Sequence, residues 1–126
     1  MQQTLVTQQL YPPLIIIHGG AGAYLKTTTK QQRIARGARL AEIAQIGLGA
    51  MRSGGAREAV LDAVAHMERD SNFNAGYGSK LQRDGVARVS AGLANGAQQR
   101  ITSVFNVQGC LHPSALANAL QNRGDR

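Results

Sequence analysis

The stretch from Glu68 to Arg83 constrains the fold most strongly, because it combines an aromatic anchor, an amide side chain and two glycines spaced by one residue. It leaves an apolar helix pattern, passes through Phe73-Asn-Ala-Gly-Tyr-Gly78 and enters a turn at Asp84-Gly85. Glycines take backbone conformations closed to residues with a Cβ, so such a stretch holds main-chain atoms in a fixed shape. It is either a tight structural connection or a site built from backbone carbonyls and one amide.

Composition predicts one globular domain. A chain of 126 residues with 43% apolar residues can bury a core, and with 4% aromatic residues that core is mostly Ala, Leu, Ile and Val. No apolar run has the roughly 20 residues of a membrane span, and no signal peptide pattern is visible at the N-terminus. The single cysteine, Cys110, excludes an internal disulfide and fits a reducing compartment. We therefore expect a cytoplasmic protein without a membrane partner.

The formal net charge of +7 raises the hypothesis of a nucleic-acid partner. The basic residues are spread from Lys26 to Arg126 without a dense run, and the aromatic residues are not interleaved with them as stacking platforms. We expect a solvated basic surface and no nucleic acid as the primary partner.

The N-terminal third predicts a strand followed by a glycine turn. Residues 1–13 form a flexible lead that ends at a Pro-Pro pair, and Leu14 to Ile17 form an apolar run typical of a strand covered on both faces. The sequence His18-Gly-Gly-Ala-Gly22, called the glycine turn below, follows directly. It is not a phosphate loop, because no Gly-Lys-Ser/Thr follows and Leu25 stands where a dinucleotide motif needs glycine.

Two helices are predicted next, over residues 29–51 and 56–68, separated by Ser53-Gly54-Gly55. The apolar face of each helix is expected at helical spacing, on Ile34, Ala38, Ala41 and Leu48 in the first and on Ala56, Val60, Val64 and Met67 in the second. The many alanines of the second helix indicate close packing against a neighbour.

The C-terminal half predicts antiparallel strands and one more helix. A hairpin is expected from residues 79–82 and 86–91 around Asp84-Gly85, and a third strand over residues 100–107 after the Asn95-Gly96 turn. Pro113 opens the last helix, with Leu116 and Leu120 on its apolar face. The order of elements predicts a layered α/β fold.

Several of these segments, in this order, resemble the plant-type asparaginases and isoaspartyl peptidases, which are N-terminal-nucleophile hydrolases. The resemblance runs from about Leu14 to the C-terminus. It is carried by the glycine turn, Ser53-Gly-Gly-Ala56, Phe73-Asn-Ala-Gly-Tyr-Gly-Ser79, Arg83-Asp-Gly85, Val89-Ser-Ala-Gly-Leu-Ala-Asn-Gly96 and His112-Pro113.

This resemblance implies a four-layer αββα sandwich, of which residues 14–126 are the N-terminal, α-subunit-like part. It also implies a precursor that cuts itself before a threonine, whose hydroxyl then attacks the side-chain amide of asparagine or a β-aspartyl peptide bond. The threonine's own α-amine serves as the base. No organic cofactor is implied, but a structural sodium ion is.

Carried onto this chain, the resemblance implies two supporting catalytic residues and a sodium loop. Asn74 would lie beside the nucleophile, although an amide in a turn also commonly bonds its own backbone. Gly19 would place a carbonyl near the threonine amine. The sodium ligands would be main-chain carbonyls between residues 67 and 77, namely those of Met67, Glu68, Asp70, Phe73, Ala75 and Tyr77.

The chain departs from the family in two ways. Ala94-Asn95-Gly96 stands where the family usually has Met-Asp-Gly, and no threonine here lies in a Thr-Val-Gly-like context. We therefore expect the catalytic half, the β-subunit-like part, to be a missing partner. The chain alone is then predicted to be inactive, exposed on its apolar strand surface and capable of forming homo-oligomers. The alternative function is a stand-alone module that binds a cation or an anion through its two glycine-rich turns.

Overall fold

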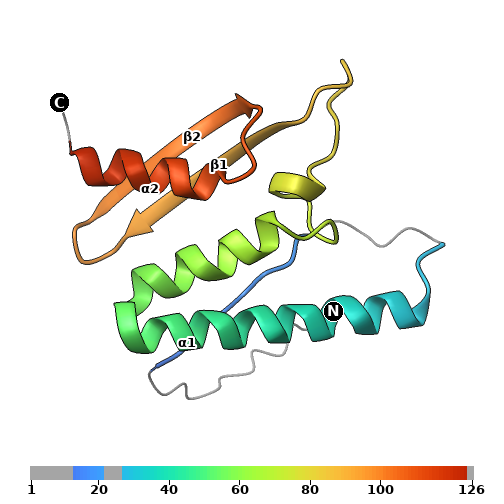
Figure 1. Cartoon of the computed structure of the whole chain (residues 1–126), viewed down its shortest axis with the longest axis horizontal. Coiled ribbons are helices and arrows are strands. Elements are labelled where there is room, and N and C mark those ends of the chain that lie inside the picture. Colours follow the sequence, from blue (N-terminus) through green and yellow to red (C-terminus); the bar gives the residue numbers. More distant parts are fainter. Residues whose placement is uncertain (1–12, 22–26, 125–126) are drawn as a thin grey trace, which may run out of the picture.

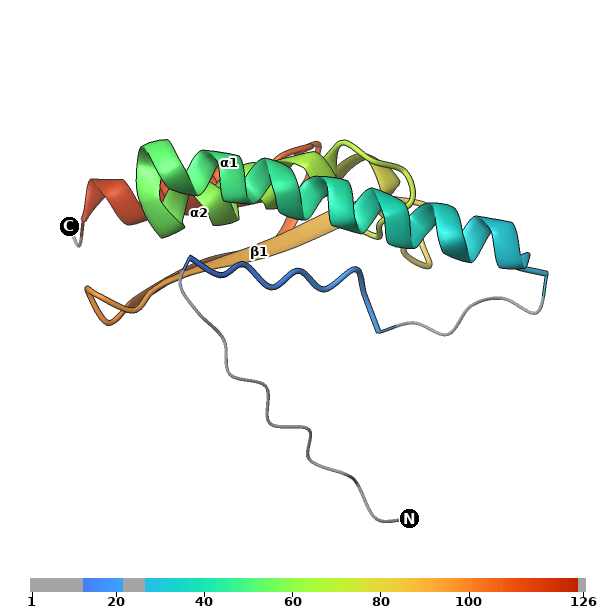
Figure 2. The ribbon, with the colours of Figure 1, turned by 90° about the horizontal axis from the view of Figure 1, so that it is seen from below.

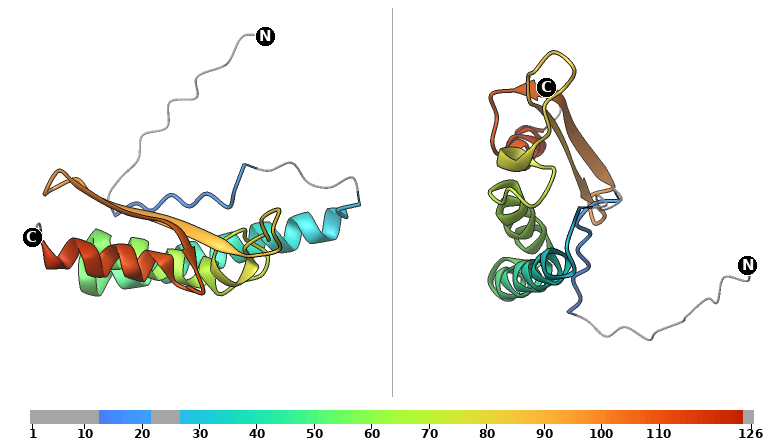
Figure 3. Two further views of the ribbon diagram at one scale, coloured as in Figure 1. Left: turned by 90° about the horizontal axis from the view of Figure 1, so that it is seen from above. Right: turned by 90° about the vertical axis from the view of Figure 1, so that its right-hand side faces the viewer.

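The computed structural model describes residues 13–21 and 27–124, which form two layers. The elements are α1 (Lys30–Glu68), the short 3₁₀ helix η1 (Gly76–Gly78), β1 (Arg88–Asn95), β2 (Arg100–Gln108) and α2 (Pro113–Arg123). The helices make one layer, and the β1–β2 hairpin with residues 13–21 makes the other (Figure 3). The α/β prediction is thus confirmed. Apart from Pro13, the predicted flexible lead lies outside the described residues, as does Gly22 of the glycine turn.

Helix α1 begins with a capping box and bends back on itself at Gly55. Thr29 Oγ1 accepts the Gln32 N–H at 3.1 Å, and Gln32 Oε1 accepts the Thr29 N–H at 2.8 Å. Gly55 has φ 79° and ψ −169°, a conformation that residues with a Cβ rarely adopt. The two arms of α1, residues 30–54 and 56–68, therefore lie side by side (Figure 1). The predicted break between two helices is confirmed.

Small residues allow the two arms to approach closely. A Cβ on Gly47 would lie 3.1 Å from the Ala59 carbonyl oxygen and 3.4 Å from the Ala63 Cβ. Ala59 and Ala63 are 0% and 4% exposed, which confirms the close packing predicted for the second helix. Ile43, one helical turn before Gly47, is fully buried and packs in one cluster with Ala63.

The predicted apolar faces of both arms are wrong in part. Ile34 is 62% exposed and Val60 is 45% exposed. The residues at the other predicted positions include three more exposed ones, Ala38, Ala41 and Ala56. The buried side is set by inter-arm contact, which favours glycine and alanine over the larger apolar residues.

The strand predicted at Leu14–Ile17 does not form within the described residues. These residues run extended along α1 without strand pairing (Figure 2). Ile15 and Ile17 pack against the core cluster around Ile43, whereas Ile16 is 80% exposed. Only one face of the run is covered here, so the expected burial on both faces is absent in the described part of the chain.

The sheet is one antiparallel hairpin, and it starts later than predicted. Of the hairpin expected across Asp84-Gly85, only the isolated bridge between Leu81 and Ala87 forms, although the turn closes with the Gln82 N–H donating to the Val86 carbonyl at 2.9 Å. The predicted turn at Asn95-Gly96 joins β1 to β2 and is confirmed, as is the strand that begins at Arg100.

The hairpin packs one face on α2 and leaves the other open. Leu93 and Val104 form a cluster with Ala117 of α2. On the opposite face, called the outer face below, Ile101 and Phe105 are 76% and 77% exposed.

The apolar face predicted for α2 is also wrong. Leu116 and Leu120 are 39% and 40% exposed, whereas Ala117 and Gln121 turn toward the sheet and are buried. The narrow space over the hairpin takes alanine and an amide that donates to the Leu93 carbonyl at 3.1 Å.

Among the described residues, no helix combines the length and the apolar character needed to cross a membrane.

Candidate functional site

The glycine turn is held against α1 by a side chain from that helix. Arg36 Nη2 donates a hydrogen bond to the Gly19 carbonyl at 2.6 Å. Within the turn, the Gly20 N–H donates to His18 Nδ1 at 3.3 Å, so His18 bonds its own turn. A Cβ on Gly19 would lie 2.9 Å from Leu40 Cδ1 and 3.3 Å from Phe73 Cε1. A side chain at position 19 would therefore have to displace the Leu40 side chain.

The segment from Met67 to Tyr77, called the carbonyl loop below, is anchored by its aromatic residue. Phe73 is 2% exposed and packs in the cluster that contains Ile43 and Ala63. Arg36 lies over the Phe73 ring, 5.5 Å from its centroid, a cation–π distance. The same arginine thus contacts both the glycine turn and the carbonyl loop.

Two glycines let the carbonyls of the loop turn inward. A Cβ on Gly76, which has φ +49°, would overlap the carbonyl oxygens of Glu68 and Leu111. A Cβ on Gly78 would overlap the Phe73 carbonyl and lie 3.0 Å from that of Asp70. The carbonyls of Glu68, Asp70 and Phe73 therefore crowd the glycines at the end of the loop.

Three of the six carbonyls proposed from the sequence accept backbone N–H groups. Met67 O accepts from Asp70 at 3.2 Å, Asp70 O from Phe73 at 3.2 Å, and Ala75 O from Gly78 at 3.0 Å. Each carbonyl oxygen has a second lone pair. Tyr77 lies in η1 with its ring 70% exposed.

A cavity of about 480 Å³ joins the glycine turn to the carbonyl loop, and both predicted catalytic residues line it. Asn74 is exposed, and its Oδ1 accepts the Lys80 N–H at 2.9 Å. Within the described residues the Asn74 amide NH₂ has no hydrogen-bond partner, so it is a donor available to a group in the cavity. Gly19 lines the same cavity, and its carbonyl oxygen, which accepts from Arg36, has a second lone pair.

The cavity is lined by basic side chains. His18, Arg36 and Lys80 are its titratable lining residues, and no described lining residue is acidic. In the described part of the chain, no group of three or more His, Cys, Asp or Glu side chains is placed to hold a metal ion.

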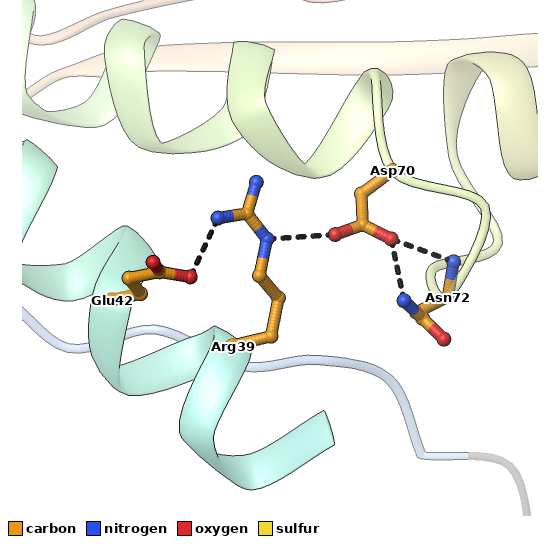
Figure 4. A network of polar contacts seen from close by, with 4 residues as sticks. All are labelled: Arg39, Glu42, Asp70 and Asn72. Atoms are coloured by element: carbon orange, nitrogen blue, oxygen red, sulfur yellow. Dashed lines mark hydrogen bonds and ion pairs between the residues drawn. The ribbon is translucent and has the colours of Figure 1, made fainter. Parts of the chain in front are cut away.

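The Asp70 side chain, which sequence reasoning did not single out, ties the loop to α1 (Figure 4). Its Oδ2 accepts Arg39 Nε at 2.8 Å, and its Oδ1 accepts the Asn72 backbone N–H at 2.9 Å and Asn72 Nδ2 at 2.7 Å. The Asn72 backbone N–H, followed by the Arg39 guanidinium, lowers the pKa of Asp70 below its ordinary value. Hydrogen bonds to Glu42 and Asp70 raise the pKa of Arg39.

The Glu68 side chain is a second feature that the sequence did not reveal. It is 2% exposed and accepts the Ser114 N–H at 3.0 Å, the Ser114 hydroxyl at 2.8 Å and His112 Nδ1 at 3.2 Å. Glu68 thereby satisfies a free amide at the N-terminus of α2, where an anion is favoured. Glu68 thus contributes its main-chain carbonyl to the carbonyl loop and its side-chain carboxylate to the N-terminus of α2.

The sequence is similar to a protein family and to several known proteins. The model of a protein family described as asparaginase matches residues 11–126. The chain is 37% identical over 111 residues to a plant-type L-asparaginase of Pyrobaculum calidifontis, covering 88% of this chain and 36% of that protein. It is 39% identical over 116 residues to an isoaspartyl peptidase/L-asparaginase of Nostoc, covering 90% and 36%. The human isoaspartyl peptidase/L-asparaginase is 33% identical over 112 residues, covering 88% and 35%. The chain spans about a third of the length of these relatives.

Proposed function

Since this chain belongs to the asparaginase family, we propose that it forms the part of an amidohydrolase that surrounds a threonine nucleophile, with the threonine supplied by a segment outside this sequence. The enzyme releases ammonia from the side-chain amide of asparagine and cleaves β-aspartyl peptide bonds, as the names of its relatives suggest. The observation that carries the proposal is the cavity that Gly19 and Asn74 both line, although 55 positions of sequence separate them.

In this proposal the threonine hydroxyl attacks the amide carbon and its own α-amine takes the proton. The Gly19 carbonyl accepts a hydrogen bond from that amine and thereby orients it. The Asn74 NH₂ donates to the threonine or to the water that later hydrolyses the acyl-enzyme. These roles agree with the chemistry of the two groups, since the carbonyl can only accept and the amide NH₂ can only donate.

The sodium site of the proposal is the carbonyl loop. A hard monovalent cation prefers oxygen ligands, and six main-chain oxygens between Met67 and Tyr77 are the candidates. The support is the crowding of the Glu68, Asp70 and Phe73 carbonyls around Gly76 and Gly78. A cation placed among these oxygens offsets the mutual repulsion of their dipoles and makes the loop rigid beside Asn74.

The partner half in this proposal completes a four-layer sandwich. Ile101 and Phe105 present an apolar face opposite α2, and stacked sheets pack about 10 Å apart. A second sheet from the threonine-bearing half would cover this outer face and bring the nucleophile to the cavity.

Ammonia release tests the catalytic proposal. We expect none from the purified 126-residue chain, and we expect hydrolysis of asparagine and β-aspartyl dipeptides when a downstream segment with a Thr-Val-Gly-like motif is supplied in cis or as a co-expressed chain. In that assembled enzyme, Asn74→Ala should lower kcat about 10²-fold, because one positioned donor is lost. Its effect on stability should stay near 1 kcal/mol, the contribution of the hydrogen bond to Lys80.

Asn95→Ala is the matched control. Asn95 Oδ1 also accepts a backbone N–H in a turn, that of Gln98 at 3.1 Å, but in a different part of the molecule. It should alter stability to a similar extent and leave kcat unchanged. Ammonia release by the isolated chain that Asn74→Ala removes would show that the assignment of a missing nucleophile is wrong.

Cation-dependent melting of the isolated chain tests the sodium proposal. The chain should be stabilised by NaCl relative to choline chloride at equal ionic strength, by about 2.7 kcal/mol when sodium reaches 100 times its Kd. Gly78→Ala should abolish the difference, because its Cβ would displace the Phe73 carbonyl. Gly96→Ala, whose Cβ would meet nothing within 4 Å, is the control and should keep it.

The same measurement tests the cation-binding form of the alternative function, a stand-alone module that binds a cation or an anion. Sodium-dependent stabilisation without hydrolysis in any assembled form would favour a stand-alone cation-binding module. If the parent chain melts identically in the two salts, the sodium site is contradicted both as part of the enzyme and as the basis of a stand-alone module.

A further inference from the structure

Arg36 is a charged side chain that contacts both parts of the candidate site. Its Nη2 donates to the Gly19 carbonyl at 2.6 Å, and its guanidinium lies 5.5 Å from the centroid of the buried Phe73 ring. It projects from the first arm of α1 and is half-buried. A planar guanidinium held on a ring face and on a carbonyl has little freedom to move, so Arg36 fixes the direction of the Gly19 carbonyl.

The hydrogen bond to Gly19 also places the positive charge of Arg36 next to the position proposed for the threonine α-amine, which is the base. The Gly19 carbonyl uses one lone pair for Arg36 and keeps the other for the incoming amine. The remaining titratable groups that line the cavity are His18 of the glycine turn and Lys80 beyond the carbonyl loop, with no acidic side chain among the described lining. Of these lining groups, Arg36 is the one that donates to the Gly19 carbonyl oxygen, the atom that also accepts from the threonine α-amine in our proposal.

We propose that Arg36 is a positioning residue that aims the Gly19 carbonyl at the N-terminal amine of the nucleophile and keeps that amine unprotonated. This inference rests on the proposed function and names how the base of that same site is controlled. An α-amine ordinarily has a pKa of about 7.7–8.0, so at neutral pH most of it carries a proton and cannot accept another. A nearby cation disfavours the protonated form and brings the pKa closer to the working pH.

The acid limb of the pH–rate profile is the measurement, made on the enzyme assembled with its downstream segment. Arg36→Gln keeps a hydrogen-bond donor for Gly19 but removes the charge, and should raise the apparent pKa of the acid limb of kcat/KM by about one unit. Arg36→Lys restores a charge and should return that pKa most of the way to the parent value. If Arg36 acted in folding alone, the acid-limb pKa would not follow this order among the parent, Arg36→Lys and Arg36→Gln enzymes.

Arg33→Gln is the matched control, because it removes the same charge from an exposed position one helical turn away. It should leave the acid limb of the parent unchanged. A parental acid limb in Arg36→Gln, whatever its total activity, overturns the inference alone. An assembled parent enzyme without any hydrolysis overturns the proposed function, and the electrostatic role of Arg36 with it.

A second measurement tests the contact itself without catalysis. In the isolated chain, the carbonyl ¹³C resonance of Gly19 should move upfield in Arg36→Ala, because a carbonyl carbon is deshielded when its oxygen accepts a hydrogen bond. Arg33→Gln should not move it. An unchanged Gly19 resonance in Arg36→Ala would show that the contact is not made in solution and would overturn the positioning role.

Discussion

The Asp70 carboxylate connects the carbonyl loop to α1 through a pair of partners on opposite sides. Arg39 approaches from the helix and Asn72 from the loop itself (Figure 4). The Asp70 side chain is only 12% exposed, so these hydrogen bonds are poorly screened by solvent. Because the folded state favours the ionised form, the loop is held less firmly once this carboxylate is protonated.

The sign of the resulting pH dependence follows from the lowered pKa of Asp70. The contribution to stability is complete above the ordinary value of 3.8 and is lost as the pH falls through the lower folded pKa. Asp70→Asn should therefore flatten the fall in the free energy of unfolding, measured with urea, as the pH is lowered below the ordinary value of 3.8. Arg39→Gln should flatten it only in part, because the Asn72 backbone N–H is the larger cause. Parallel curves for Asp70→Asn and the parent would contradict this.

Single residues of the site differed in how far the sequence could predict them. Gly19 and Asn74 were predicted from motifs, and the structure brings them to one cavity. Arg36 lies outside the apolar positions predicted for its helix, and the sequence pattern did not single it out. Its partner lies 17 positions away in a turn whose approach to α1 depends on tertiary packing. Local pattern carries no information about such a contact.

At the scale of elements, Glu68 couples the end of α1 to the start of α2. Its buried carboxylate accepts two donors of Ser114 and one of His112, across 46 and 44 positions of sequence. Pro113 at the first turn of α2 has no N–H to offer, so the Ser114 amide is the first donor that the helix presents. Without Glu68, the buried donors would lose their partner.

Glu68→Ala should lower the free energy of unfolding by about 3 kcal/mol, because unsatisfied buried donors cost about 1–3 kcal/mol each. Glu68→Gln should cost less, since its amide oxygen can still accept one of them. Glu58→Ala is the control on the same arm of α1. Glu58 is exposed, and the change should stay within about 0.5 kcal/mol. Urea unfolding of the three variants checks the order, and an Ala variant as stable as the control contradicts the coupling.

Element types were more predictable than the faces they bury. Both arms of α1, the Asn95-Gly96 turn and α2 follow from capping, glycine and proline signals. The strand at Leu14–Ile17 was not found, because a strand needs a pairing partner that no described segment provides. The buried faces were misassigned because Gly47, Ala59 and Ala117 are small, and their burial reflects close approach to a neighbour more than hydrophobicity.

At the scale of the whole molecule, the outer face of the hairpin leaves two large apolar side chains uncovered among the described residues. Helices cover one side of the sheet (Figure 3). Ile101 and Phe105, on the outer face, are 76% and 77% exposed. An exposed apolar sheet face favours association with another surface, in our proposal the threonine-bearing half.

The isolated chain should therefore self-associate through this face. Light scattering across a concentration series should show a rising mean mass, and Ile101→Ser with Phe105→Ser should shift it toward the monomer. Ile34→Ser is the control, since Ile34 is 62% exposed on α1 and far from the sheet in sequence. It should associate as the parent does. A parent chain that stays monomeric at all concentrations would contradict the prediction.

Because Glu68 links the carbonyl loop to α2, it couples the local unfolding of these two segments. Its main chain belongs to the start of the carbonyl loop, while its side chain accepts the Ser114 N–H. Opening of the last turn of α1 must therefore release the start of α2 in the same event, so both belong to one cooperative unit of local unfolding. The exchange rate of the Ser114 amide hydrogen thus reports the integrity of a loop that lies some forty residues earlier in the sequence.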